Sequence, residues 1–113
     1  MHIKLLSLSK NQDFKSLLTG KKISNKYLNI FFKNLSNKSS NYLNISFVTQ
    51  KKLGNAVKRN KIKRRLKNIM NQILKISKLN LNYSYLIITK KNIISANYAD
   101  IKKVMFKDFK KIK

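Results

Sequence analysis

Alternating apolar residues predict two β-strands in the first half of the chain. The segments KYLNIFFKN (residues 26–34) and YLNISFVTQ (residues 42–50) place an apolar residue at every second position, which is the period of a strand with one buried face. The polar segment LSNKSSN separates them, so we expect an antiparallel pair joined by a loop. The residues expected on the buried faces are Leu28, Ile30 and Phe32 in the first strand, and Leu43, Ile45 and Phe47 in the second.

Helical spacing appears in three other segments. Residues 11–20 predict a short helix that ends at Gly20, a residue that readily adopts a left-handed conformation. A longer helix begins at about Asn55, because apolar residues then recur at intervals of three and four. The last helix begins near Ser95 and continues to the end of the chain. The core-facing stripe of the longer helix is Ile62, Leu66, Ile69 and Ile73.

These elements predict one α+β domain. The nearly continuous apolar segment at residues 84–89 is typical of a strand in the centre of a sheet. The expected order is helix, two or three strands, helix, strand and helix, which favours a sandwich with the helices on one face of a small sheet. No repeat, linker or low-complexity segment interrupts the sequence, so residues 1–113 are expected to form a single domain.

The charge of the chain points to a polyanionic partner. The formal net charge is +24, from 27 Lys and Arg against three acids, and residues 14–99 contain no carboxylate. A basic tail on an indifferent domain is the bland alternative, but the charge extends over the whole length. A polybasic membrane-surface protein is another, although no lipidation motif or apolar anchor accompanies the charge. We therefore expect a nucleic acid partner.

The sequence offers little for catalysis or metal binding. Without carboxylates in residues 14–99, two-metal hydrolysis by this chain is excluded. The single histidine is His2, near the terminus, and the two glycines cannot form a phosphate-binding loop. No cysteine, spanning segment or signal peptide is present, so we expect a cytoplasmic protein without disulfides. We expect no catalytic residue and no metal site in the protein.

The segment KKLGNAVKRNKIKRRLK, residues 51–67, holds nine Lys or Arg in 17 positions and no acid. On the longer helix, amides and cations lie opposite the apolar stripe, and a solvated face would usually carry charges of both signs. The preceding turn, with Gly54 at a positive φ, brings two lysines to the helix N-terminus, where phosphate is favoured. The residues expected opposite the stripe are Asn60, Arg64, Lys67 and Asn71, flanked by Lys61, Lys63 and Asn68.

This segment resembles the signature of the bacterial ribonuclease P protein subunit family. The segments NQDFKSLLTGKKISNKY and SYLIITKK resemble the same family in the same order. The resemblance implies a small protein that binds the catalytic RNA of ribonuclease P, one protein per RNA. Together they remove the 5′ leader of precursor tRNA, with Mg²⁺ held in the RNA. It also implies the order α-β-β-β-α-β-α with a left-handed βαβ crossover, whereas the physical default is right-handed.

The resemblance assigns residues to two binding surfaces. The family usually has arginine where this chain has Lys61 and Lys67, which keep the charge but lose bidentate geometry. An aromatic position in the first helix is here Leu18. The RNA-binding residues are expected to be Lys51, Lys52, Asn55, Arg59, Asn60, Lys61, Lys63, Arg64 and Lys67, with the turn at Gly54. A cleft for the 5′ leader is expected to contain Phe14, Tyr27 and Phe31.

Strand alternation supports an aromatic platform independently. Tyr27 and Phe31, with Tyr42 on the neighbouring strand, share a face with Asn and Lys side chains, as stacking of unpaired bases requires. The alternative is that a helix packs on this face. Two other functions fit the composition: a structural ribosomal protein, and a DNA-binding module that inserts the basic helix into a major groove. The second lacks a helix-turn-helix partner or a dimerising stripe.

Overall fold

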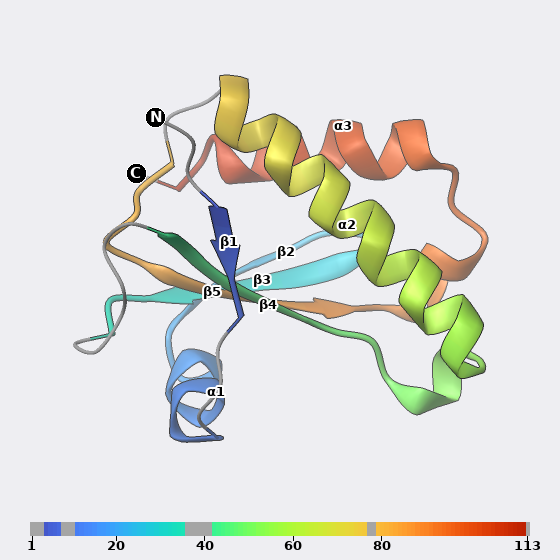
Figure 1. Cartoon of the computed structure of the whole chain (residues 1–113), viewed down its shortest axis with the longest axis horizontal. Coiled ribbons are helices and arrows are strands. Elements are labelled where there is room, and N and C mark those ends of the chain that lie inside the picture. The colour runs from blue at the N-terminus through green and yellow to red at the C-terminus, as the bar shows by residue number, and fades with distance from the viewer. Residues whose placement is uncertain (1–3, 8–10, 36–41, 77–78, 113) are drawn as a thin grey trace.

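The strands form one five-stranded sheet in the order β1-β4-β5-β3-β2 (Figure 1). The computed structural model describes residues 4–7, 11–35, 42–76 and 79–112. As predicted, the most apolar strand, β5, lies in the centre. It pairs antiparallel with β3 and parallel with β4. The strands are β1 (Lys4–Leu6), β2 (Lys21–Ser24), β3 (Leu28–Lys33), β4 (Tyr42–Val48) and β5 (Ser84–Thr89).

The expected antiparallel pairing of β3 with β4 is wrong, because β5 lies between them. In the register, Ile87 has Ile30 on one side and Phe47 on the other. A strand with apolar side chains on both faces buries most surface when it has a neighbouring strand on each side. This favours β5 in the place between β3 and β4 over a hairpin that pairs β3 directly with β4. The short β1, which pairs parallel with β4, was not predicted because three residues are too few to show alternation.

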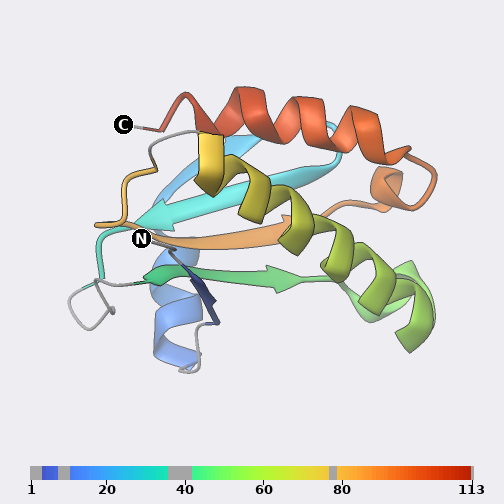
Figure 2. The ribbon, with the colours of Figure 1, turned by 45° about the horizontal axis from the view of Figure 1, so that its top comes forward.

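Helices lie on both faces of the sheet, not on one as expected. Figures 1 and 2 show α2 (Ala56–Ile76) and α3 (Tyr98–Phe109) on one face and α1 (Asn11–Leu18) on the other. The reason is that β5 has buried side chains on both of its faces. Tyr85 and Ile87 belong to the larger core beneath α2 and α3, and Leu86 joins Leu17 of α1 in a smaller core. Burial raises the pKa of Tyr85, whose hydroxyl donates to the carbonyl of Asn80 at 2.7 Å.

The β4-α2-β5 unit is a left-handed crossover, as the family resemblance implies. Both strands run from left to right in Figure 1, and α2 returns above the sheet. Figure 2, with the top turned forward, has β4 below β5 and β5 below β3, so β4 is nearest the viewer in Figure 1. A chain that runs right, rises, returns left and then moves away from the viewer turns in the left-handed sense. Connections of this kind are right-handed in nearly all proteins.

Gly20 ends α1 for a steric reason, not the expected conformational one. Among the described residues, the glycine with a positive φ is Gly54, so the predicted left-handed conformation of Gly20 is wrong. A Cβ at Gly20 would lie 2.7 Å from the carbonyl oxygen of Phe32 and 2.9 Å from Cβ of Lys33. The absence of a side chain therefore lets the chain after α1 pass directly over the end of β3.

A tight turn sets the start of α2. The turn η1 (Lys51–Leu53) follows β4 and contains Lys51 and Lys52. Buried Leu53 anchors it, and Gly54 has φ 140°. The Oδ1 atom of Asn55 accepts from the backbone N–H of Lys58 at 2.9 Å, which is the N-cap of α2. Likewise Asn97 caps α3, two residues after the expected start at Ser95; the turn η2 (Lys91–Ile94) precedes it.

We expect Gly20→Ala to lower the free energy of unfolding by about 1–3 kcal/mol, because the new Cβ must displace backbone atoms of β3. Urea denaturation of the purified protein measures the change. The control is Lys21→Ala at the exposed neighbouring position, which should change stability by less than about 0.5 kcal/mol. Equal stability of the Gly20 variant and the wild type would contradict the steric explanation.

We expect Asn55→Ala to destabilise the protein by about 1 kcal/mol, because the Lys58 N–H loses its acceptor. Asn55→Asp keeps an oxygen in the same place and adds a negative charge at a helix N-terminus, so its unfolding midpoint should match or exceed that of the wild type. Thermal denaturation of both variants distinguishes a cap from a residue whose side chain has no structural role. If both substitutions lowered the midpoint equally, the cap would not be the cause.

Candidate RNA interface

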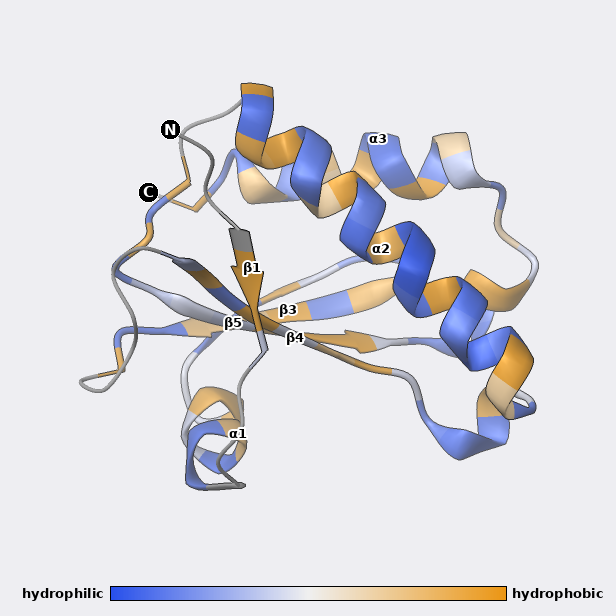
Figure 3. Cartoon of the chain, in the orientation of Figure 1, coloured by the Kyte–Doolittle hydropathy of each residue, from blue (hydrophilic) through white to orange (hydrophobic). Residues whose placement is uncertain are grey.

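The outer side of α2 carries the expected polar stripe. The apolar stripe is buried against the sheet, as predicted, and Met70 is buried beside it. Asn60, Arg64, Lys67 and Asn71 are all exposed on the opposite side, and Figure 3 shows hydrophilic residues along the viewed side of this helix. The helix has 21 residues and none is acidic. It therefore presents cations and amides in one row to the solvent.

The flanks of this stripe hold further cations at intermediate depth. Lys61 is exposed, whereas Arg59 and Lys63 are half-buried. The Nε atom of Arg59 is enclosed and has no hydrogen-bond partner among the described residues. Among the residues that the structure describes, no ion pair involves a basic residue of α2. The ion pair that occurs there joins Lys111 to Asp108 at 3.5 Å. The positive charge of α2 is therefore not neutralised by carboxylates of the described chain.

The lysine turn, residues 51–55, adds positive charge at the N-terminus of α2. Lys51 and Lys52 are exposed in η1, directly before the helix. No acid lies in the first turn of α2, and the helix dipole places partial positive charge at the same end. This arrangement favours a phosphate group. The Oδ1 atom of Asn55 is already occupied as the cap, so the structure gives this residue a helix-starting role, and its contact with RNA stays a prediction.

An aromatic surface lies on the opposite side of the sheet, beside α1. Phe14 of α1 and Phe31 of β3 are half-buried there, at the margin of the small core around Leu17. The Nζ atom of Lys22 lies 6.0 Å from the centroid of the Phe31 ring, within the range of cation–π attraction. The alternative interpretation, that a helix covers this face of the sheet, therefore holds for part of the face. The helix α1 buries Leu17 and leaves the two phenylalanines at its edge.

A groove of about 520 Å³ connects this sheet face with the lysine turn. Asn29 and Ile88 face it from neighbouring strands, where they are cross-strand partners, and Lys52 faces it from η1. The Oδ1 atom of Asn29 is buried and has no partner in the described structure. Lys90 is fixed at the groove wall, because its Nζ donates to Ser24 Oγ at 2.7 Å and to the carbonyl of Asn25 at 2.6 Å. Lys91 also lines the groove.

Tyr27 does not share the face of Phe31, and this expectation is corrected. Tyr27 is 8% exposed and belongs to the larger core on the α2 and α3 side. The cause is the side chain of Asn25, whose Oδ1 accepts from the backbone N–H of Tyr27 and of Leu28. This turn ends the alternation one residue before β3, so Tyr27 is unavailable as a stacking platform. Tyr42 is exposed at the start of β4. The residues after it do not alternate in exposure, because Asn44 and Ser46 are buried as well as Leu43 and Ile45.

Sequence reasoning missed the groove residues Asn29, Lys90 and Lys91. A signal existed for the first, since Asn29 alternates with Phe31 on the strand. No periodicity shows that the chain after β5 returns to Lys52, because this depends on the pairing of distant strands. Among the described residues, no group of three or more His, Cys, Asp or Glu side chains could hold a metal ion. His2 lies outside the described residues.

Within the described residues, no helix combines the length and apolar composition that crossing a membrane requires.

Comparisons with known proteins all point to one family. The chain matches the family model described as Ribonuclease P over residues 4–113. It is 36% identical to the ribonuclease P protein component of Fusobacterium nucleatum, covering 95% of this chain and 96% of the relative. It is 32% identical to that of Mycoplasma capricolum, covering 94% of each chain.

Solved structures share the fold. The RNase P protein from Thermotoga maritima superposes with a TM-score of 0.80 at 20% identity, covering 96% of this chain and 98% of that one. The Staphylococcus aureus RNase P protein gives a TM-score of 0.76 at 24% identity, covering 93% and 92%. The family match spans all of the described residues and includes both surfaces described above. The chain therefore belongs to the ribonuclease P protein family.

Proposed function

We propose that this chain is the protein subunit of ribonuclease P and that it assists endonucleolytic removal of the 5′ leader of precursor tRNA. In this role it binds the catalytic RNA and the leader on two different surfaces. The observation that carries the proposal is the acid-free stripe of α2, joined to the lysine turn, in a chain of this family. A structural ribosomal protein is not favoured, because the relatives are ribonuclease P components.

The stripe of α2 and the lysine turn are the proposed contact with the RNA subunit. The guanidinium of Arg64 is exposed and can donate two parallel hydrogen bonds to one phosphate. Lys61 and Lys67 act as point charges where the family usually has arginine. The amides of Asn60 and Asn71 both donate and accept, so they suit base edges and 2′-hydroxyls. Half-buried Arg59 adds a further guanidinium on the flank of the same stripe.

The aromatic surface beside α1 and the adjoining groove are the proposed site of the leader. Unpaired nucleotides bind proteins by stacking on aromatic rings and by contact with cations along the backbone. Phe14 and Phe31 supply the rings, and Lys22 and Lys52 supply the charge. Asn29 also lines the groove, between the strand that carries Phe31 and the lysine turn. The groove thus extends from Asn29, two residues before Phe31 on β3, to the lysine turn.

We infer that the RNA subunit holds the Mg²⁺ that phosphodiester hydrolysis requires. The three acids of the chain support this inference, because they lie on separate segments or are otherwise engaged. Asp108, for example, accepts from Asn25 Nδ2 at 2.8 Å and pairs with Lys111. The contribution of the protein is then to bind and orient the precursor. We also propose one protein per RNA, as the family resemblance implies.

We expect Arg64→Ala to weaken binding of the full-length protein to a ribonuclease P RNA and to reduce the slope of log K against log salt by about one. Arg64→Lys keeps the charge, so it should preserve the slope and lose only the part of the affinity that depends on two parallel hydrogen bonds. Filter binding at several salt concentrations measures both quantities. Unchanged affinity and slope in the alanine variant would remove Arg64 from the interface.

Reconstitution tests the proposed function directly. The full-length protein, combined with a ribonuclease P RNA at low Mg²⁺, should accelerate release of the 5′ leader from precursor tRNA. A structural ribosomal protein would give no acceleration. In the same assay, Phe31→Ala should reduce the preference for leader-bearing precursor over mature tRNA by about fivefold to 100-fold, the equivalent of one lost stack.

The matched control for Phe31 is Ile94→Ala, which removes an exposed apolar side chain of η2 that does not line the groove. It should leave the preference for the leader unchanged. Binding of the RNA subunit should be unaffected in both variants, because neither residue lies on α2. If Phe31→Ala retained the full preference for the leader, the aromatic surface would not be the leader site.

A further inference from the structure

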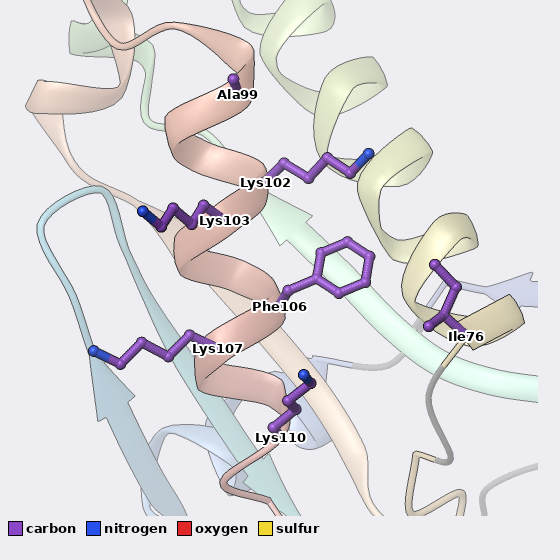
Figure 4. A pocket seen from close by; sticks show the side chains of 7 residues that line it. All are labelled: Ile76, Ala99, Lys102, Lys103, Phe106, Lys107 and Lys110. Atoms are coloured by element: carbon purple, nitrogen blue, oxygen red, sulfur yellow. The ribbon is translucent and has the colours of Figure 1, made fainter.

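A second groove, of about 590 Å³, lies between the last turn of α2 and the outer side of α3 (Figure 4). Its floor is apolar and consists of Ile76, Ala99 and Phe106, and four lysines surround it: Lys102, Lys103, Lys107 and Lys110. None of the described residues that line it is acidic. It lies on the helical face of the molecule, away from the proposed leader site on the other side of the sheet.

The outer side of α3 is not an ordinary solvated face. The inner side of this helix is fully occupied by buried residues such as Ile101, Met105 and Phe109. Phe106 extends toward α2 and is half-buried at the margin of the larger core, and Ile76 is 74% exposed. An aromatic ring and a branched apolar side chain that line one surface groove are unusual on a helix face that otherwise needs only charge for solubility.

The cations are arranged around the ring in a regular way. Figure 4 shows Lys102, Phe106 and Lys110 extending toward α2, while Lys103 and Lys107 extend to the other side of α3. The first three are spaced by four residues, so the ring lies between two ammonium groups along one line of the helix. The Nζ atom of Lys102 lies 5.9 Å from the centroid of the Phe106 ring, within the range of cation–π attraction.

The groove is held open by a contact between the two helices. Gln72 of α2 donates to the hydroxyl of Tyr98 of α3 at 2.8 Å and to Asn68 at 3.1 Å. This polar link fixes the spacing of the helices one turn before Ile76. Exposed Lys75 lies on the same side of α2 as Arg64, Lys67 and Asn71, and it directly precedes Ile76 of the groove.

Charge complementarity selects the class of partner. The lining cations require an anion, and the ring between them requires a flat apolar group next to that anion. A nucleotide supplies both, as a base beside a phosphate. A lipid surface would need a broader apolar face, since interfacial helices bury a whole row of large side chains. An acidic peptide would satisfy the cations but would gain little from an aromatic floor.

We propose that this groove is a further single-stranded RNA site, in which a base stacks on Phe106 and the flanking phosphates contact Lys102 and Lys110. The site extends the stripe of α2 across Ile76 onto α3. It does not depend on binding of the leader on the sheet face. An RNA that follows the stripe of α2 would therefore continue into this groove with one unpaired nucleotide.

Titration of the full-length protein with the trinucleotide ApApA, followed by two-dimensional ¹H–¹⁵N NMR, tests the proposal. We expect chemical shift changes at residues 99–110 and at Ile76, and a shift of the Phe106 ring protons that indicates stacking. Phe106→Leu retains apolar volume for packing and should weaken binding at these residues by about fivefold to 100-fold. Phe106→Tyr retains the ring and should bind as the wild type does.

Charge variants provide the second measurement. The double variant Lys102→Gln and Lys110→Gln should reduce the salt slope of binding at the groove by about 1.4, the value for two phosphate contacts on a single strand. The matched control is Lys15→Gln with Lys21→Gln, which removes the same charge from α1 and β2 and should leave the groove-specific slope unchanged. Circular dichroism establishes that each variant is folded as the wild type is.

Three results would overturn the proposal. The first is shift changes confined to the outer stripe of α2 and the sheet face, with none at residues 99–110. The second is equal binding of ApApA by the Phe106→Leu variant and the wild type. The third is a response of the groove to poly-L-glutamate, or to vesicles of phosphatidylserine, that equals the response to ApApA at the same charge concentration, since this would indicate an acidic peptide or a lipid surface.

Discussion

The burial of β5 on both faces is the constraint on which the rest of the structure depends. Its side chains alternate between the core beneath α2 and α3 and the core beneath α1. The two cores therefore depend on each other, because successive side chains of this one strand point alternately into one core and into the other. The same alternation separates the two proposed RNA surfaces, with the basic helices above the sheet and the aromatic surface below it. A change in the register of β5 by one residue would exchange the two cores.

The second constraint is electrostatic. With three acids against 27 basic residues, the chain cannot stabilise itself through surface ion pairs, and its stability comes from apolar burial and from polar links such as the Asn55 and Asn97 caps. The structural asparagines are notable in this respect. Asn25, Asn55 and Asn97 each use a side-chain oxygen to start an element. An amide performs this task without adding a carboxylate that would repel RNA.

Much of this could be predicted from the sequence. The apolar stripe of α2, the exposed row opposite it and the central position of β5 followed from local periodicity, which reports what each residue faces. Pairing partners did not follow, because β3 and β4 are equally compatible with each other and with β5. The position of Tyr27 depends on the turn at Asn25. This turn interrupts the alternation of side chains between the two faces of the sheet, although the sequence of apolar and polar residues still alternates there. The hand of the crossover came from the family resemblance and not from physical reasoning, which favours the opposite hand.

The location of Lys52 has a consequence for the way two polyanions share one protein. This residue belongs to the lysine turn before α2 and also lines the groove that continues onto the sheet face. In the proposed arrangement one ammonium group thus stands between the RNA subunit and the substrate strand. Its three donors can serve both, and its single positive charge reduces the repulsion between their backbones where they approach most closely. Lys52 is then a counterion within the ribonucleoprotein, and the two RNAs are thermodynamically linked through it.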